Sequence, residues 1–258
     1  MRLVFDYKIF DHVISRNKIE GRTTSKVIVI LSKLMRLKFF TYVLSTFENI
    51  LGFILTLPIP IYKSFIHLYI SNIEGLPKYF GMYLRAIYYK KKLKFMGTNV
   101  FIDQGVIISN PSEFQIHEFS YIDKNVSFLS EKTRIGKRCH IAGNVFVGGG
   151  GDFVMHDYAG IAPRVNIITS SESFKNGVRA SGPMVKPEQR KVVRGKVTLE
   201  KDAFLSTGVT VLPNVVIGEG SLIGAGVTVY KNTSSWTIHV NERSKQIGNR
   251  EKVIFEED

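Results

Sequence analysis

The stretch IGKRCHIAGNVFVGGGGDFVMHDYAGIAPRVNI, residues 135–167, places an apolar side chain at every sixth position, apart from one two-residue insertion. These positions are Ile135, Ile141, Val147, Met155, Ile161 and Ile167. A period of six fits neither an amphipathic helix nor a strand that alternates every two residues. It indicates a solenoid in which each side of a triangular coil takes six residues.

The repeat extends in both directions from this stretch. In the same frame, apolar residues begin further hexads at Ile102, Ile108, Ile116, Ile122, Phe128, Leu199, Leu205, Val211, Ile217, Ile223 and Val229. The fifth position is mostly small or β-branched, as at Cys139 and Val145, and the second is often glycine, as at Gly136, where we expect a corner with unusual backbone angles. The 17 hexads form about six coils. The apolar first position and the small or β-branched fifth position repeat with the same period, which favours a β-helix over a β-sandwich.

The hexads divide the chain into three segments. Residues 1–95 carry no repeat and look helical, residues 96–234 form the β-helix with an inserted loop at 170–196, and residues 235–258 form a polar tail. The single cysteine excludes an intramolecular disulfide framework and indicates a reducing compartment. The first residues lack the unbroken apolar core of a cleavable signal peptide, so we expect a cytoplasmic protein.

The net charge of +13, from 35 basic and 22 acidic residues, predicts anionic partners: nucleic acid, membrane lipid or a phosphorylated small molecule. The loop SSESFKNGVRASGPMVKPEQRKVVRGK, residues 170–196, is basic and unusually long, which favours binding of a substrate over mere decoration. We expect no binding of nucleic acid, because this loop is poor in the aromatic side chains on which single strands stack.

The segment FFTYVLSTFENILGFILTLPIPI, residues 39–61, is long enough to cross a bilayer and has Glu48 as its sole charge. Against a full span, Glu48 lies near the middle, Pro58 and Pro60 break the end, and lysines and arginines flank the segment. We predict a helix or bent hairpin at the cytoplasmic membrane surface, with its basic flanks on anionic lipid. The alternative is that these residues pack against the solenoid or a neighbouring subunit.

Two stretches carry a resemblance to a known family. VTLEKDAFLSTGVTVLPNVVIGEGSLIGAGVTVYKN, residues 197–232, resembles the terminal coils of the hexapeptide-repeat acyltransferases. CHIAGNVFVGGGGDFVMHDYAGIAPRVNI, residues 139–167, is similar to a subgroup that acetylates sugars of bacterial surface polysaccharides. The resemblance implies a left-handed parallel β-helix, a homotrimer with active sites between subunits, and acetyl-CoA as donor without a metal. The acceptor would be a nucleotide-linked or lipid-linked sugar destined for lipopolysaccharide or capsule.

Acyl transfer to a hydroxyl or amine needs a base, and a neutral imidazole serves this purpose near neutral pH. His140 occupies an outward hexad position, and the resemblance implies that it is the base; the alternative is a surface histidine without a role. Cys139 points inward, so a Cys–His pair is not expected. Glu172 would orient the imidazole or hold the acceptor. The loop residues expected to bind the acceptor are Ser170, Ser171, Arg190 and Lys191.

The pantetheine arm of CoA would run along the last coils. The residues expected to contact CoA are Ser206, Thr207, Gly224, Ala225 and Gly226, with Lys231 or Lys245 near its phosphates. The glycines at 148–151 indicate either a ligand groove or a bulge at the two-residue insertion. The family commonly ends in a Gly-Asn-Pro-Ala motif, where this chain reads VNERSK, residues 240–245. That departure supports a second hypothesis, a non-catalytic trimeric binding scaffold.

Overall fold

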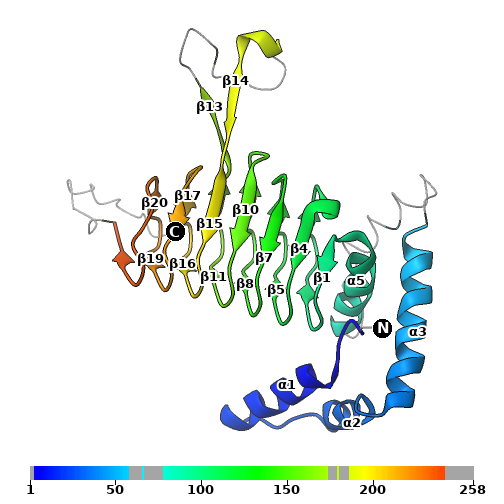
Figure 1. Ribbon diagram of the computed structural model, residues 1–258. Coiled ribbons are helices and arrows are strands. Elements are labelled where there is room, and N and C mark those ends of the chain that lie inside the picture. Colours follow the sequence, from blue (N-terminus) through cyan, green and yellow to red (C-terminus); the bar gives the residue numbers. More distant parts are fainter. Residues whose placement is uncertain (1–2, 58–65, 67–77, 174–178, 180–185, 242–258) are drawn as a thin grey trace, which may run out of the picture.

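A computed structural model describes residues 3–57, 66, 78–173, 179 and 186–241 (Figure 1). Within these residues, four helices precede the β-helix: α1 (Tyr7–Ile19), α2 (Lys26–Leu34), α3 (Lys38–Leu55) and α5 (Lys78–Lys92). Short parallel strands then stack into three faces, and one antiparallel hairpin projects from them (Figure 1). This arrangement confirms the predicted fold class, a mainly β chain coiled as a parallel β-helix after a helical segment.

The three faces of the coil are named A, B and C in chain order. Within the described residues, face A contains β1 (Phe95–Met96), β4 (Phe114–Ile116), β7 (Thr133–Ile135), β10 (Asp152–Met155), β15 (Lys196–Leu199) and β18 (Val216–Ile217). Face B contains β2 (Phe101–Ile102), β5 (Tyr121–Ile122), β8 (His140–Ile141), β11 (Gly160–Ile161), β16 (Phe204–Leu205), β19 (Leu222–Ile223) and β21 (Ile238–His239). Face C contains β3 (Ile107–Ile108), β6 (Ser127–Phe128), β9 (Phe146–Gly148), β12 (Asn166–Ile168), β17 (Thr210–Val211) and β20 (Thr228–Val229).

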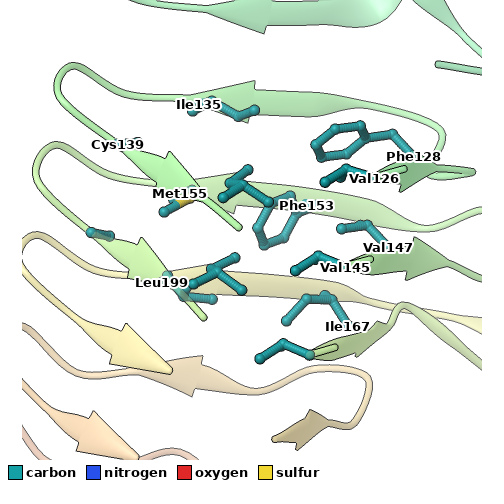
Figure 2. Packing of buried hydrophobic residues seen from close by; sticks show 14 of the residues in the cluster. Val126, Phe128, Ile135, Cys139, Val145, Val147, Phe153, Met155, Ile167 and Leu199 are labelled. Atoms are coloured by element: carbon teal, nitrogen blue, oxygen red, sulfur yellow. The ribbon is translucent and has the colours of Figure 1, made fainter. Parts of the chain in front are cut away.

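The core is a stack of equivalent hexad positions. On face B, Ile141 pairs in register with Ile122 on one side and Ile161 on the other, and all three side chains are buried. Figure 2 shows apolar side chains from successive coils, such as Ile135 and Met155, meeting inside the prism. The six-residue period therefore reflects one inward apolar residue on each side of each coil.

Glycine at the second hexad position has a different cause from the one predicted. The left-handed residues lie at the fourth position, as at Arg138 (φ 55°) and Asn144 (φ 61°). Gly136 is instead needed because the next coil passes close by. A Cβ there would lie 2.6 Å from the backbone nitrogen of Asp157, a contact that backbone cannot relieve.

Extra residues are confined to one corner of the prism. The hexad spacing is six residues at every A–B and B–C corner, whereas the C–A corner holds the 3-10 helix η1 (Pro111–Glu113), the glycine run and the hairpin. The hairpin, called the arm below, pairs β13 (Ser170–Ser173) with β14 (Lys191–Arg194) and includes the 3-10 helix η3 (Pro187–Gln189). The described part of the predicted loop thus contains regular structure. The coil also continues beyond the predicted boundary at residue 234, because β21 pairs with β19.

Helix α5 closes the N-terminal end of the coil. Tyr88, Tyr89 and Leu93 belong to the same buried cluster as the coil residues, and the Tyr89 hydroxyl donates to the Val106 carbonyl oxygen at 3.1 Å. Beside them the buried Arg85 guanidinium donates from Nε to the Ile102 carbonyl oxygen at 2.9 Å. This cap covers apolar side chains and a backbone carbonyl that the first coil would otherwise expose.

Arg85 also forms a buried ion pair with Asp103, with 3.3 Å between Nη2 and Oδ1. Burial lowers the pKa of Arg85, and the nearby Asp103 carboxylate opposes that shift. Asp103 additionally accepts from the Gln104 backbone nitrogen at 2.7 Å and from the Tyr121 hydroxyl at 3.1 Å. The pair therefore joins the helical cap to face B.

Helix α3 packs against α5, and its inner side includes a buried carboxylate. The Glu48 carboxylate, 4% exposed, accepts from the Val4 backbone nitrogen at 2.9 Å and from the Tyr83 hydroxyl at 3.2 Å. Its Oε2 lies 3.8 Å from Lys90 Nζ. Burial raises the pKa of Glu48, and these partners offset part of that shift. One side of the segment 39–61 therefore packs against the protein, as in the alternative given above. Residues 58–61 of this segment lie outside the described residues. No helix in the described ranges is both long and apolar enough to cross a membrane.

Replacing Arg85 by Met should destabilise the protein by about 3–5 kcal/mol, because Asp103 then keeps a buried charge without its cation. Chemical denaturation of the purified chain measures this change in the free energy of unfolding. Arg134→Met is the matched control, since Arg134 is exposed on face A and its loss should change stability by less than about 0.5 kcal/mol. Equal stability of the two variants would contradict the proposed role of the pair.

Candidate functional site

His140 projects outward from face B, as the hexad register predicts. Its imidazole is exposed and stacks on the Tyr121 ring, with 5.4 Å between the ring centroids and an interplanar angle of 17°. The Tyr121 hydroxyl donates to Asp103 Oδ2 at 3.1 Å and lies 3.4 Å from Asp123 Oδ1. Burial is the main cause that raises the pKa of Tyr121, and the two carboxylates raise it further. The phenol therefore stays neutral beside the imidazole.

The neighbouring coil places a glycine in register with His140. In register, His140 is followed along face B by Gly160 and then Phe204. A Cβ at Gly160 would come within 2.8 Å of Phe204 Cδ2, so the Phe204 ring leans over the glycine. The result is an exposed imidazole among aromatic side chains, a surface suited to a sugar ring or to the same face of another subunit.

Cys139 is a core residue, as predicted. Its side chain is 2% exposed, and its thiol donates to the His156 carbonyl oxygen at 3.1 Å. Burial raises the pKa of the Cys139 thiol to about 12, so the thiolate is absent near neutral pH. A thiol in this state is a poor nucleophile, which leaves His140 as the reactive side chain of the pair.

The arm carries the other predicted catalytic and acceptor-binding residues. Ser170, Ser171 and Glu172 lie on β13, and Lys191 lies on β14. Arg190, just before β14, places Nη2 3.5 Å from Glu172 Oε1. In its described residues the arm has more lysine and arginine than acidic side chains, so it offers positive charge to an anionic ligand.

The glycine run forms the base of the arm. Gly151 donates its backbone N–H to Thr169 Oγ1 at 2.9 Å, and that hydroxyl donates to the Gly148 carbonyl oxygen at 2.9 Å. A Cβ at Gly149 would lie 2.6 Å from the Ser170 backbone nitrogen, and one at Gly150 would lie 3.3 Å from Arg194 Nε. These contacts favour the bulge interpretation of the run over an open ligand groove.

Within one chain the structure places His140 and the arm at different corners. His140 follows the A–B corner, whereas the arm leaves the coil at the C–A corner and projects away from it (Figure 1). Glu172 contacts Arg190 on its own arm, and His140 stacks on Tyr121. A site that uses both His140 and Glu172 therefore needs residues from two copies of the chain.

Five of the six residues predicted to contact CoA come together at the B–C corner. Ser206 and Thr207 follow β16, and Gly224, Ala225 and Gly226 follow β19 one coil later. The Gly226 N–H donates to the Thr207 carbonyl oxygen at 3.0 Å, and Asn241 Nδ2 donates to the Gly226 carbonyl oxygen at 2.9 Å.

Lys231 does not belong to this group. It follows β20 at the end of face C, so a full side of the prism separates it from Gly226. Of the stretch VNERSK, Val240 and Asn241 are described, whereas residues 242–245 lie outside the described residues, as does Lys245.

A cavity of about 500 Å³ opens at the A–B corner that leads into β8. Its lining combines the cations Lys8, Lys137 and Arg138 with three carboxylates and the rings of Phe119 and Tyr158. Sequence reasoning missed this cavity, because Lys8 comes from the helical segment, which has no repeat to fix its position. Among the described residues, no group of three or more histidine, cysteine or acidic side chains is arranged to hold a metal ion.

Comparisons with known proteins identify relatives of the coil. Residues 196–231 match the family described as bacterial transferase hexapeptide (six repeats). A crystal structure of AntD, an N-acyltransferase from Bacillus cereus, in an aspartate-to-asparagine variant with dTDP and coenzyme A, is 31% identical. It covers 63% of this chain and 87% of that chain with a TM-score of 0.55.

The chain belongs to the hexapeptide-repeat transferase family.

Two curated relatives are named as an acyltransferase and an O-acetyl transferase. The chain is 34% identical to dTDP-4-amino-4,6-dideoxy-D-glucose acyltransferase of Escherichia coli over 117 residues, which are 45% of this chain and 60% of that protein. It is 31% identical to the E. coli K12 protein named as a lipopolysaccharide biosynthesis O-acetyl transferase, WbbJ, over 107 residues, 41% of this chain and 52% of the relative. The matches thus span less than two thirds of these relatives.

Gly151→Ala should lower stability by about 1–3 kcal/mol, because its Cβ would overlap the Thr169 and Gly195 carbonyl oxygens at the base of the arm. Thermal unfolding followed by circular dichroism measures the loss. Gly143→Ala is the control, since its nearest contact is the Lys124 carbonyl oxygen at 3.2 Å. If both variants melt together, the glycine run has no structural role at the arm.

Proposed function

We propose that this chain is an acyltransferase that moves an acetyl group from acetyl-CoA to an amine or hydroxyl of a sugar linked to a nucleoside diphosphate. The observation that supports it best is the exposed imidazole of His140 on a hexapeptide-repeat coil, stacked on the Tyr121 ring. The relatives support the donor and the acceptor class, because AntD was crystallised with dTDP and coenzyme A and an E. coli relative acylates a dTDP-linked amino sugar.

In this mechanism neutral His140 removes the proton from the acceptor as it attacks the thioester carbonyl. The stacked Tyr121 ring fixes the plane of the imidazole, so the side chain loses little freedom when the acceptor binds. Backbone N–H groups would stabilise the oxyanion, and the CoA thiolate would leave as the C–S bond breaks. The buried Cys139 thiol takes no part, so transfer is direct and proceeds without an acyl-enzyme.

The arm would supply the acceptor contacts in a homotrimer. Because His140 and Glu172 stand at different corners of one chain, an arm from one subunit would reach His140 of a neighbour, where Glu172 would orient the imidazole or hold the acceptor. Arg190 and Lys191 would face the diphosphate, with Ser170 and Ser171 near the sugar. For CoA, the B–C corner from Ser206 to Gly226 offers the pantetheine arm an exposed edge with backbone groups.

The product would enter surface polysaccharide. This destination is supported by the similarity to the O-acetyl transferase of lipopolysaccharide biosynthesis. Because one relative is named for an amino sugar and the other is named as an O-acetyl transferase, the proposal covers both N- and O-transfer.

His140→Ala should lower kcat by about 10²–10⁴-fold, the usual contribution of a general base. The measurement is release of CoA thiol from acetyl-CoA with a panel of dTDP-linked amino and neutral sugars. His156→Ala is the matched control, because His156 is also an exposed histidine of the coil and should leave kcat within a factor of about two. Wild-type turnover in the His140 variant, at unchanged molecular mass, would remove His140 from the mechanism.

A mixing experiment tests whether two subunits share a site. His140→Ala and the double variant Arg190→Ala, Lys191→Ala should each be nearly inactive alone. Coexpression of the two chains should restore activity, since about one in four interfaces of a randomly assembled trimer then joins an intact His140 to an intact arm. Coexpressed chains that assemble together and stay inactive would exclude a shared site.

A further inference from the structure

Helix α3 directs its large aromatic side chains to solvent, whereas its inner side combines buried polar residues with the partly buried Leu51 and Leu55. The buried residues of α3 are Ser45, Glu48 and Gly52. On the opposite side Phe39 is 80% exposed and Phe53 is 66% exposed, and Tyr42, Val43, Phe47 and Ile50 are exposed with them. A helix on a globular protein normally turns its apolar stripe inward, so the outer side of α3 needs a separate explanation.

The orientation of α3 is fixed by specific contacts. Gly52 lies against α5, where a Cβ would come within 3.1 Å of Lys91 Cγ and 3.4 Å of Ile87 Cγ2. Glu48 accepts the Val4 backbone N–H and the Tyr83 hydroxyl, as described above. Turning α3 over would bury large rings against α5 and expose these hydrogen bonds to water. The apolar outer side is therefore a feature of the folded protein.

Exposed apolar side chains also occur on α2 and in the turn before α3. Val27, Ile30 and Leu37 are 61%, 55% and 55% exposed. Together with the outer side of α3 they form what we call the α2–α3 surface, comprising Val27, Ile30, Leu37, Phe39, Tyr42, Val43, Phe47, Ile50 and Phe53. Concentrated apolar exposure of this kind marks contact with another molecule or a membrane.

The charges around the α2–α3 surface are positive. Lys26, Lys33 and Lys38 are exposed on α2 and at the start of α3, whereas Glu48, the sole acidic residue from 26 to 55, is buried. Residues 1–57 as a whole contain nine lysines and arginines against four acidic residues. An apolar helical surface edged by lysines matches the boundary between anionic lipid headgroups and acyl chains.

We propose that the α2–α3 surface docks onto an anionic lipid bilayer, with α3 lying in the plane of the interface. The phenylalanines enter the acyl boundary, and the lysines contact the headgroup phosphates. A second copy of the chain would be a poorer partner for this surface. Its own α2–α3 surface carries the same lysines, and neither α2 nor α3 has an exposed carboxylate to pair with them. Helix α5 lies between α3 and the first coil, so the membrane meets the N-terminal end of the prism (Figure 1).

The test is cosedimentation of the full chain with vesicles of phosphatidylcholine alone and of phosphatidylcholine mixed with phosphatidylglycerol. Wild type should bind the mixed vesicles and bind pure phosphatidylcholine much less. The triple variant Phe39→Ser, Phe47→Ser, Phe53→Ser should lose at least about tenfold in affinity. Removing charge with Lys33→Ala and Lys38→Ala should cost about fivefold for each lysine on the anionic vesicles, an effect that salt should also produce.

The matched control is Tyr230→Ser, which removes an exposed ring from the other end of the coil and should bind like wild type. Equal sedimentation of wild type and the triple variant would overturn the proposal. So would a wild-type particle larger than the triple variant in solution without vesicles, because a second copy would then cover the surface. Neither result depends on acetyl transfer, so the vesicle test stands or falls separately from the proposed enzymatic activity.

Discussion

The structure depends on one constraint: in a stack of parallel coils, each inward side chain must lie over its counterpart in the coil before and the coil after. Ile141 lies between Ile122 and Ile161 because the backbones of three coils are hydrogen-bonded in register. A slip of one residue would turn Ile141 outward and carry His140 into the core. The register that buries the aliphatic residues is thus also what exposes the imidazole and sets it on Tyr121.

The same constraint decides where the coil can vary. The A–B and B–C corners keep a fixed spacing, so residues on faces A and B stay aligned from coil to coil. The C–A corner takes up every extra residue, and there the loop-closure cost of a longer connection is small compared with the cost of breaking a ladder. The arm is the extreme case, held at its base by Thr169 and the glycine run. A rigid coil with one variable corner can change the length and sequence of that corner without losing its core.

Much of the fold and part of the site could be predicted from the sequence. The period of six gave the coil, the outward His140 and the inward Cys139, because in a repeat each position has one environment. The hairpin in the arm was not predicted, since a single excursion has no second copy to reveal its pairing. Lys231 lies a full side of the prism away from the other predicted CoA residues, and its contact with the CoA phosphates stays a prediction. The second-position glycines were located correctly but explained wrongly, because close approach between coils cannot be seen within one hexad.

The structure of the helical segment was harder to predict from the sequence, because this segment contains no repeat. The apolar run from Phe39 predicted either membrane contact or packing. One side of α3 packs against the protein, and membrane contact of its exposed side stays a prediction. The inner side of α3 joins α5, and α5 reaches the site through Arg85, Asp103 and Tyr121 to His140. Because strands of one face lie about 4.8 Å apart, β8 stands about 10 Å from β2 and the helical cap, nearer to it than the corner at Ser206 and Gly226. If α3 lies on a bilayer and His140 is the base as proposed, an acceptor arriving from that end would meet His140 first. The proposed CoA corner, at the more distant end of the coil, would stay open to solution.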